Sequence, residues 1–284
     1  MRIFYILFFI LSAAASAYGQ ENLTLSTDSK KGKLYFYWGW NTAQYSSSDI
    51  EFKGEDHNFV LKNVKSHDHD LRWKVSEHLN PGRLTIPQFN FRVGYFLNDH
   101  WDISIGTDHM KYVVNDLQTV KISGYIEGTG TVYDGVYDND DIVIDQESFL
   151  EFEHTDGLNY VNVGLRRNDK LASLTSFADL NLLVGVNAGV LIPKTNSDLL
   201  NKGKNDEFHL AGYGVGATGG LNLTLFKVFF IQTELKSGYI NLPSIITTPV
   251  DTDRGKQDFL FSQWNVVFGG YINLNKKHKA KNKR

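Results

Sequence analysis

Apolar and polar residues alternate along residues 259–274, the last strand-like segment of the chain. One face of this segment is apolar and the other is mainly polar; the apolar face carries Trp264, Val266, Phe268, Ile272 and Leu274. A period of two residues is typical of a β-strand with two different surroundings. The segment is longer than the usual strand of about 5–6 residues. A tilted strand that crosses a bilayer needs about 9–11 residues, so the pattern predicts a membrane-spanning strand.

The same period recurs in seven other segments, namely residues 32–44, 86–97, 101–113, 156–167, 176–192, 208–226 and 227–241. Long and short links alternate between the eight segments, and this alternation is typical of outer-membrane barrels. The sequence therefore predicts an all-β fold: an eight-stranded antiparallel up-and-down transmembrane β-barrel with long extracellular loops and short periplasmic turns. A soluble two-sheet sandwich is the alternative, but it would place its apolar residues inside.

Two polar triplets, at residues 98–100 and 168–170, are predicted to form short periplasmic turns. The first long link, residues 45–85, is predicted to contain a hairpin of residues 50–52 with residues 59–64. The second long link, residues 115–153, is strongly acidic. These links are long enough to extend the sheet outside the membrane.

The N-terminus has the pattern of a secretory signal peptide. Arg2 precedes an apolar run at residues 3–11, and small residues follow up to Gly19. The apolar run is too short to span a bilayer, which takes about 20 residues. We therefore expect a signal peptide at residues 1–19, a periplasmic lead-in at 20–31, the barrel at 32–274 and a basic periplasmic tail at 275–284.

Composition narrows the class of protein further. The 284 residues include no cysteine, which excludes disulfides and cysteine-based zinc or redox sites. Aromatic residues make up 13% of the chain, and amphipathic aromatic side chains suit membrane–water interfaces. The mean hydropathy of −0.29 excludes a bundle of hydrophobic helices.

Seven charged residues fall on the predicted inward face of the strands. They are Arg92, Asp102, Asp108, Arg166, Asp179, Glu234 and Lys236. An eight-stranded barrel has an interior just wide enough for side chains, and charges in such a space must pair. We therefore predict an ion-pair network that fills the lumen. The alternative is an ion path, and hence a narrow pore for small solutes, or a catalytic carboxylate.

The end of the last strand carries the spacing Gly269-x-x-Ile272-x-Leu274, which resembles the signal that barrel proteins present to the barrel-assembly machinery. With the signal peptide, eight strands and long outer loops, the chain resembles the small outer-membrane β-barrel proteins of Gram-negative bacteria, the OmpA-type eight-stranded superfamily. It departs from them in its basic tail and in lacking the usual terminal Phe. The resemblance implies a place in the cell outer membrane and contact with its lipid and lipopolysaccharide. We expect a monomer.

Two loop clusters are candidate metal sites. His67 and His69 lie two residues apart in the first long link, with His57 and His78 nearby. Together with a carboxylate they could coordinate Zn²⁺ or Cu²⁺. Asp138 and Asp140 in the second link could attract Ca²⁺, although no EF-hand glycine follows them. In each case a solvated polar loop is the alternative, and we predict no cofactor.

A catalytic interpretation depends on His109, His154 and Asp156 near the outer rim. This group faintly resembles the lipid A deacylase type of barrel hydrolase, but Asp156 replaces that family's serine. The nucleophile would then be Ser123, Ser148 or Thr155. We favour a structural or interaction role over this hydrolase and over the narrow pore, and we expect no nucleic-acid partner.

Overall fold

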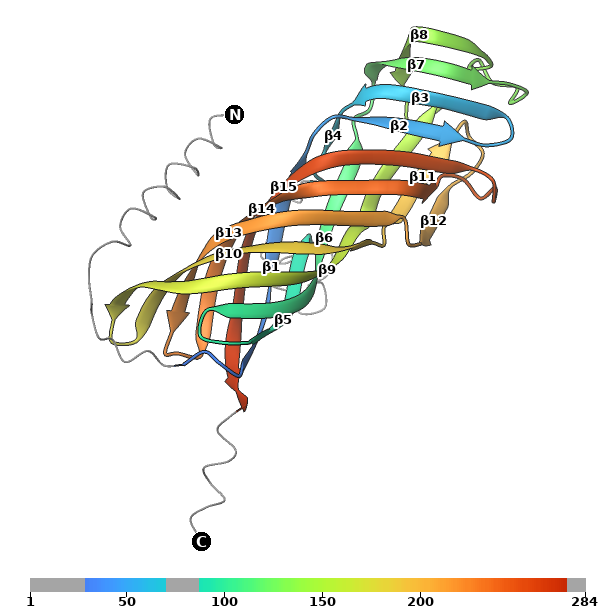
Figure 1. Cartoon of the computed structure of the whole chain (residues 1–284). Coiled ribbons are helices and arrows are strands. Elements are labelled where there is room, and N and C mark those ends of the chain that lie inside the picture. The colour runs from blue at the N-terminus through green and yellow to red at the C-terminus, as the bar shows by residue number, and fades with distance from the viewer. Residues whose placement is uncertain (1–28, 70–86, 275–284) are drawn as a thin grey trace.

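The computed structural model describes residues 29–69 and 87–274, and these residues fold mainly into antiparallel β-strands (Figure 1). Eight strands form a ring: β1 (Lys33–Tyr45), β5 (Phe89–Phe96), β6 (Trp101–Val114), β9 (Leu150–Thr175), β10 (Ala178–Leu191), β13 (Gly212–Leu225), β14 (Phe229–Ile246) and β15 (Arg254–Asn273). Seven more lie in the links: β2 (Ser48–Lys53), β3 (His57–Val64), β4 (Ser66–His67), β7 (Gln118–Ile126), β8 (Gly135–Ile144), β11 (Lys194–Leu199) and β12 (Asn205–Phe208). None of the described residues forms a helix long and apolar enough to cross a membrane.

The ring is closed by its first and last strands. β1 pairs antiparallel with β15, from Lys33 opposite Asn273 to Tyr45 opposite Phe261. Around the ring the order is β1-β5-β6-β9-β10-β13-β14-β15, so each ring strand pairs with the next one along the chain. A closed ring leaves no backbone edge unpaired, as a lipid environment requires. The predicted eight-stranded up-and-down barrel is confirmed.

The two faces of the ring differ in polarity. On β6, Asp102, Ser104 and Asp108 are buried inside, whereas Ile103 and Ile105 are exposed on the outer surface. Every other ring strand also contributes exposed apolar residues, among them Phe36, Val93, Val163, Val186, Val215, Ile231 and Phe268. A continuous outer belt of this kind is what a lipid-facing surface needs. It marks the membrane-spanning part of the barrel.

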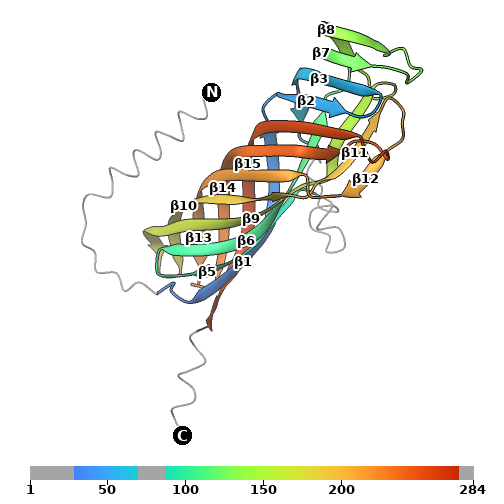
Figure 2. The ribbon, with the colours of Figure 1, turned by 45° about the vertical axis from the view of Figure 1, so that its right-hand side comes forward.

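On the side of the long links the sheet continues beyond the ring (Figures 1 and 2). Above the end of β1, β15 pairs with β2, and the sheet runs on through β3 and β7 to β8. There β9 also pairs with β11, β11 with β12, and β6 with β4. The predicted hairpin is present as β2 and β3. We call these seven strands, with the adjoining ends of β6, β9, β14 and β15, the extracellular extension.

An apolar core fills the extracellular extension. Its fully buried aromatic residues include Phe52, Phe59 and Phe152, and Phe52 stacks on Phe59 with ring centroids 5.2 Å apart. Leu61 on β3 and Ile122 on β7 are also fully buried there. Because burying an aliphatic or aromatic side chain contributes roughly 1.5–3 kcal/mol, this core makes the extension an ordered body.

Both ends of the described chain lie at the opposite, periplasmic end of the barrel, together with the short turns at residues 97–100, 176–177 and 226–228. One predicted turn is wrong: residues 168–170 continue β9, which turns into β10 only at residues 176–177. Their polar side chains are used at the barrel mouth instead, where Asn168 accepts a hydrogen bond from Lys30 and Asp169 contacts Arg167 and His100. The predicted signal peptide, most of the lead-in and the tail lie outside the described residues.

Candidate functional site

The barrel lumen contains a compact group of charges. Arg166 donates from Nε to Asp102 Oδ1 at 3.2 Å and from Nη1 to Glu234 Oε1 at 3.1 Å. Its guanidinium carbon lies 4.9 Å from the centroid of the Tyr35 ring, a distance suited to a cation–π contact. All three charged side chains are at most 8% exposed. The arginine therefore joins two carboxylates from different sides of the barrel wall.

A second group lies beside the first. Lys236 donates to Asp108, and Arg92 donates to Asn162 Oδ1 at 2.6 Å and to Ser104 Oγ at 3.0 Å. The buried lumen thus holds three cations and three carboxylates, and their formal charges cancel. Buried charges of this kind are tolerated only when they are paired and hydrogen-bonded.

Asp179, the seventh residue predicted for the network, lies elsewhere. It is partly exposed at the periplasmic mouth, 2.6 Å from Lys170. Asp179 faces inward beside Asn181 and Thr224, but it lies at the periplasmic start of β10 and not at the level of the other charges. The structure brings the other six residues together and leaves Asp179 outside the group.

The charged layer has apolar neighbours above and below. Towards the periplasm it meets a cluster of Tyr35, Tyr37, Phe96, Phe230, Val267 and Tyr271. Towards the outside it meets the core of the extension, beginning at Met110 and Tyr160. A cavity between these layers, lined by Arg92, Arg166 and Lys236 among others, has a volume of about 10 Å³. This space holds about one water molecule.

The candidate catalytic residues do not form one site. His109 Nδ1 contacts Asn159 Oδ1 at 2.8 Å, while Asp156 is exposed and accepts from Lys194 Nζ at 2.8 Å. His154 is fully buried, and its Nδ1 lies 3.0 Å from the Thr195 hydroxyl, which is also fully buried. Burial, and to a smaller degree the neighbouring His209, lowers the pKa of His154 to about 3.

These contacts give His154 a hydroxyl neighbour that the sequence did not indicate, but neither group reaches solvent. Of the three candidate nucleophiles, Ser148 Oγ contacts the Tyr133 hydroxyl and Ser123 Oγ accepts from the backbone of Asn139, so neither is paired with a histidine. The side chain of Thr155 lies outside the described part of the structure. A histidine with a pKa near 3 is a weak general base at neutral pH.

The predicted metal ligands are exposed on the extracellular extension. His67 contacts Asn115 through Nδ1, and His69 is exposed beside it. Asp138 and Asp140 are exposed on β8, where Asp140 accepts a hydrogen bond from the backbone nitrogen of Asp138. Within residues 29–69 and 87–274, neither pair belongs to a group of three close metal-ligand side chains.

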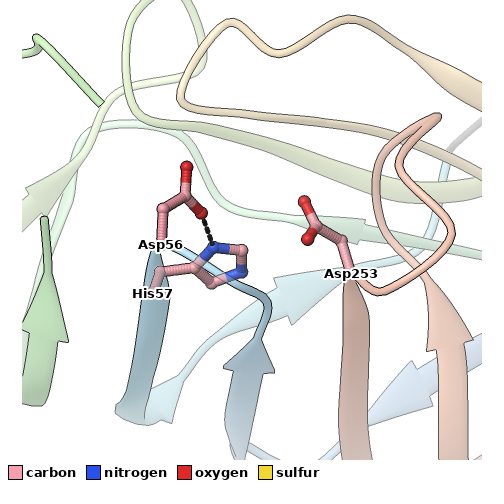
Figure 3. Close-up of side chains that lie close together, drawn as sticks. All are labelled: Asp56, His57 and Asp253. Atoms are coloured by element: carbon pink, nitrogen blue, oxygen red, sulfur yellow. Dashed lines mark hydrogen bonds and ion pairs between the residues drawn. The ribbon is translucent and has the colours of Figure 1, made fainter. Parts of the chain in front are cut away.

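A different group has the spacing of a metal site. Asp56, His57 and Asp253 offer ligand atoms that all lie within 4.8 Å of one another (Figure 3). They come from the β2–β3 turn, the first residue of β3 and the β14–β15 link, so no local spacing in the sequence indicated all three. His57 and Asp253 are buried, and a Cβ on Gly54 would lie 2.3 Å from Asp253 Oδ1.

The chain supplies its own cation to this group. Lys202 Nζ contacts Asp56 Oδ1 at 2.5 Å and Asp253 Oδ2 at 3.3 Å. Burial would raise the pKa of Asp56, but hydrogen bonds from Lys202 and His57 outweigh it and keep the pKa below its ordinary value. The ammonium group therefore occupies the position of a metal ion and ties three extracellular links together.

The predicted assembly signal lies on the closing strand. Gly269 faces inward, where a Cβ would lie 2.1 Å from the carbonyl oxygen of Phe36, so no larger residue fits. Ile272 and Leu274 are about half exposed on the outer face. Recognition by the assembly machinery remains a prediction.

Comparison with solved structures finds other outer-membrane proteins. Ail, the attachment invasion locus protein of Yersinia pestis, is 11% identical, with 85% of this chain and 99% of that chain covered and a TM-score of 0.32. The outer membrane protein OprG from Pseudomonas aeruginosa is 11% identical, with 86% and 97% covered and a TM-score of 0.38. The outer membrane protein AlkL is 10% identical, with 90% and 98% covered and a TM-score of 0.40.

These values are too low for any function to be transferred. No protein-family model matches the chain, and no curated protein matches it significantly. The assignment follows from the architecture itself: a closed ring of eight antiparallel strands, an apolar outer belt and a filled, charged interior. The chain is a small eight-stranded β-barrel protein of the cell outer membrane.

Proposed function

We propose that this protein is an interaction protein, in which the barrel anchors the extracellular extension and the extension presents a binding surface to partners outside the cell. The observation that carries the proposal is the continuity of the strands. β6, β9, β14 and β15 pass from the membrane belt into the extension, where a shared apolar core packs them against the added strands. A rigid scaffold that displays exposed strands and loops is typical of binding proteins.

The β7–β8 hairpin is the best candidate for the binding surface. Residues 118–144 contain five acidic residues and a single lysine, Lys121. Val132 and Val136 are 92% and 87% exposed close to these acids. Exposed apolar residues within a charged surface are a feature of interaction sites. The chemistry favours a basic partner surface with some apolar character.

Binding of a lysine-rich peptide to the full-length protein in nanodiscs tests this proposal. The double variant Asp138→Asn/Asp140→Asn should bind decalysine several-fold more weakly, and the difference should shrink as salt screens the charges. The control variant Glu207→Gln/Asp258→Asn removes the same charge from other exposed positions of the extension. Equal binding by both variants would contradict the assignment to β7 and β8.

The narrow pore has less support. Five of the six lumen charges form ion pairs, and Arg92 donates to neutral side chains. Apolar side chains lie on both sides of this layer. We expect the protein to produce no sustained conductance in planar bilayers. Sustained openings of single molecules would favour the pore instead.

A further inference from the structure

A groove with a volume of about 860 Å³ crosses the wall of the barrel over β10, β13, β14, β15 and β1. Its lining includes Val186, Val215 and Leu260, which are 60%, 49% and 60% exposed. The lining residues next to them in sequence, Asn187 and Phe261, are buried on the inner side of the wall. The groove therefore opens outward, away from the lumen. We call it the belt groove.

The floor of the belt groove consists of small outward side chains that lie side by side. The strand register places Ala217 opposite Ser237, and Ser237 opposite Ser262. The hydroxyl oxygens of Ser237 and Ser262 are 3.1 Å apart and share a hydrogen bond. This bond lowers the cost of placing the two hydroxyls next to a hydrocarbon chain.

Larger outward side chains border the floor on both sides. Towards the outside of the cell, Val215 lies opposite Tyr239, and Tyr239 lies opposite Leu260. Towards the periplasm, Leu235 lies opposite Trp264. The belt groove therefore runs across the strands, and five neighbouring strands about 4.8 Å apart give it a length of roughly 19 Å. This long, narrow shape suits an extended hydrocarbon chain.

The belt groove lies at the outer edge of the membrane belt. On β15, the exposed Leu260 is followed towards the outside by the exposed Asp258, and Asn241 on β14 lies opposite Asp258. The Tyr239 hydroxyl accepts a hydrogen bond from the Asn241 side chain at 3.1 Å. Tyrosine with its hydroxyl among polar groups is typical of a membrane–water interface. The groove is therefore continuous with the lipid-facing belt, just below the headgroups of the outer leaflet.

We propose that the belt groove binds one acyl chain of an outer-leaflet lipid, which lies across the strands. The occupant follows from the position of the groove, because the belt around it faces lipid. A chain in the groove contacts the floor and both walls, whereas a chain on the convex remainder of the belt contacts the protein on one side only, and dispersion attraction grows with the number of contacts. The site is on the barrel wall, so its test is independent of the interaction role proposed for the extension.

The test uses the full-length protein in nanodiscs that contain a trace of phosphatidylcholine with a diazirine in one acyl chain. After illumination, mass spectrometry of the digested protein compares the label on β13–β15 with the label on β5 and β6, on the other side of the ring. In the wild type, the groove strands should carry several-fold more label.

Two variants locate the bound chain. Ala217→Leu/Ser262→Leu fills the floor and should lower the label on the groove strands to the level of the opposite wall. The control Thr107→Leu places the same side chain on β6, across the ring from β14, and should leave the groove label unchanged. Heat-modifiable gel mobility checks that each variant is folded.

Three results would overturn the proposal. The first is equal labelling all around the wild-type barrel, which needs no variant to be observed. The second is a groove label that Ala217→Leu/Ser262→Leu leaves unchanged or that Thr107→Leu lowers equally. The third is a dimer in native mass spectrometry that Ala217→Leu/Ser262→Leu dissociates, since a second copy of the chain would then fill the groove.

Discussion

The barrel lumen and the core of the extracellular extension are two interiors built on the same faces of the same strands. On β6, the inward residues Asp102, Ser104 and Asp108 are followed by the buried Met110 and Tyr112. On β15, the inward residues change from Asn265 and Gln263 to Phe261 and Phe259 in the same direction. The outer surface changes in the opposite sense, from Trp264 and Val266 to Asp258 and Lys256.

This inversion shows which solvent each half of a strand faces. Where a strand crosses the lipid, its apolar side chains face outward and its polar side chains face the narrow lumen. In water, the apolar side chains must be buried for the hydrophobic effect to stabilise the fold. The lumen is therefore held by paired charges and hydrogen bonds, whereas the extension is held by packing. The two interiors should respond differently to the loss of a single side chain.

The largest effect is expected in the lumen. Arg166→Met leaves Asp102 and Glu234 buried without their shared cation, and breaking a buried ion pair in this way costs about 3–5 kcal/mol. The free energy of unfolding in urea, measured in lipid vesicles, should fall by this amount. The neighbouring Arg167 points outward and pairs with Asp169, so Arg167→Met should cost less than about 1 kcal/mol.

A compensated variant sharpens this prediction. Arg166→Met combined with Asp102→Asn and Glu234→Gln leaves no unpaired charge, so much of the lost stability should return. If Arg166→Met lowers the free energy of unfolding no more than Arg167→Met does, the charges do not stabilise the lumen.

Loss of packing in the extension should have a smaller and more local effect. Leu61→Ala removes a fully buried side chain from the apolar core, which costs about 3 kcal/mol. Pulse proteolysis in urea should show earlier cleavage of the extension, while the barrel keeps its heat-modifiable gel mobility. Leu210 is 66% exposed, so Leu210→Ala should leave the cleavage midpoint nearly unchanged. If Leu61→Ala also abolishes the heat-modifiable gel mobility of the barrel, the two interiors do not unfold separately.

The sequence predicted those features that repeat along the chain. The alternation in β15 and in the other seven ring strands was enough to predict the closed ring. The same alternation identified inward charges such as Arg166. Asp179 faces inward as predicted, but the alternation does not give its depth: it lies at the periplasmic start of β10 and pairs with Lys170 instead of the lumen charges. Lys202 was missed because it contacts Asp56 and Asp253 from other links, and only the folded extension brings them together. Residues from different links have no fixed spacing in the sequence, so a sequence pattern does not predict that they contact one another.

The smallest expected effect is a change in the stability of the extension with pH. The folded pKa of His154, about 3, lies below the ordinary value of 6.5, because burial disfavours the charged ring. A histidine kept neutral in the fold contributes its full stability above about pH 6.5 and loses about 1.4 kcal/mol per pH unit below it, until the pH approaches 3. At pH 5 the extension should therefore be about 2 kcal/mol less stable than at pH 7.5.

Pulse proteolysis at pH 7.5 and pH 5 measures this difference, and His154→Gln should remove most of it, because glutamine can still contact the Thr195 hydroxyl without titrating. His100 is exposed at the periplasmic end, so His100→Gln should leave the pH dependence of the extension unchanged. The same scan should leave the lumen unaffected, because the described lumen network contains no histidine. Equal acid sensitivity of the wild type and His154→Gln would mean that His154 is not responsible for it.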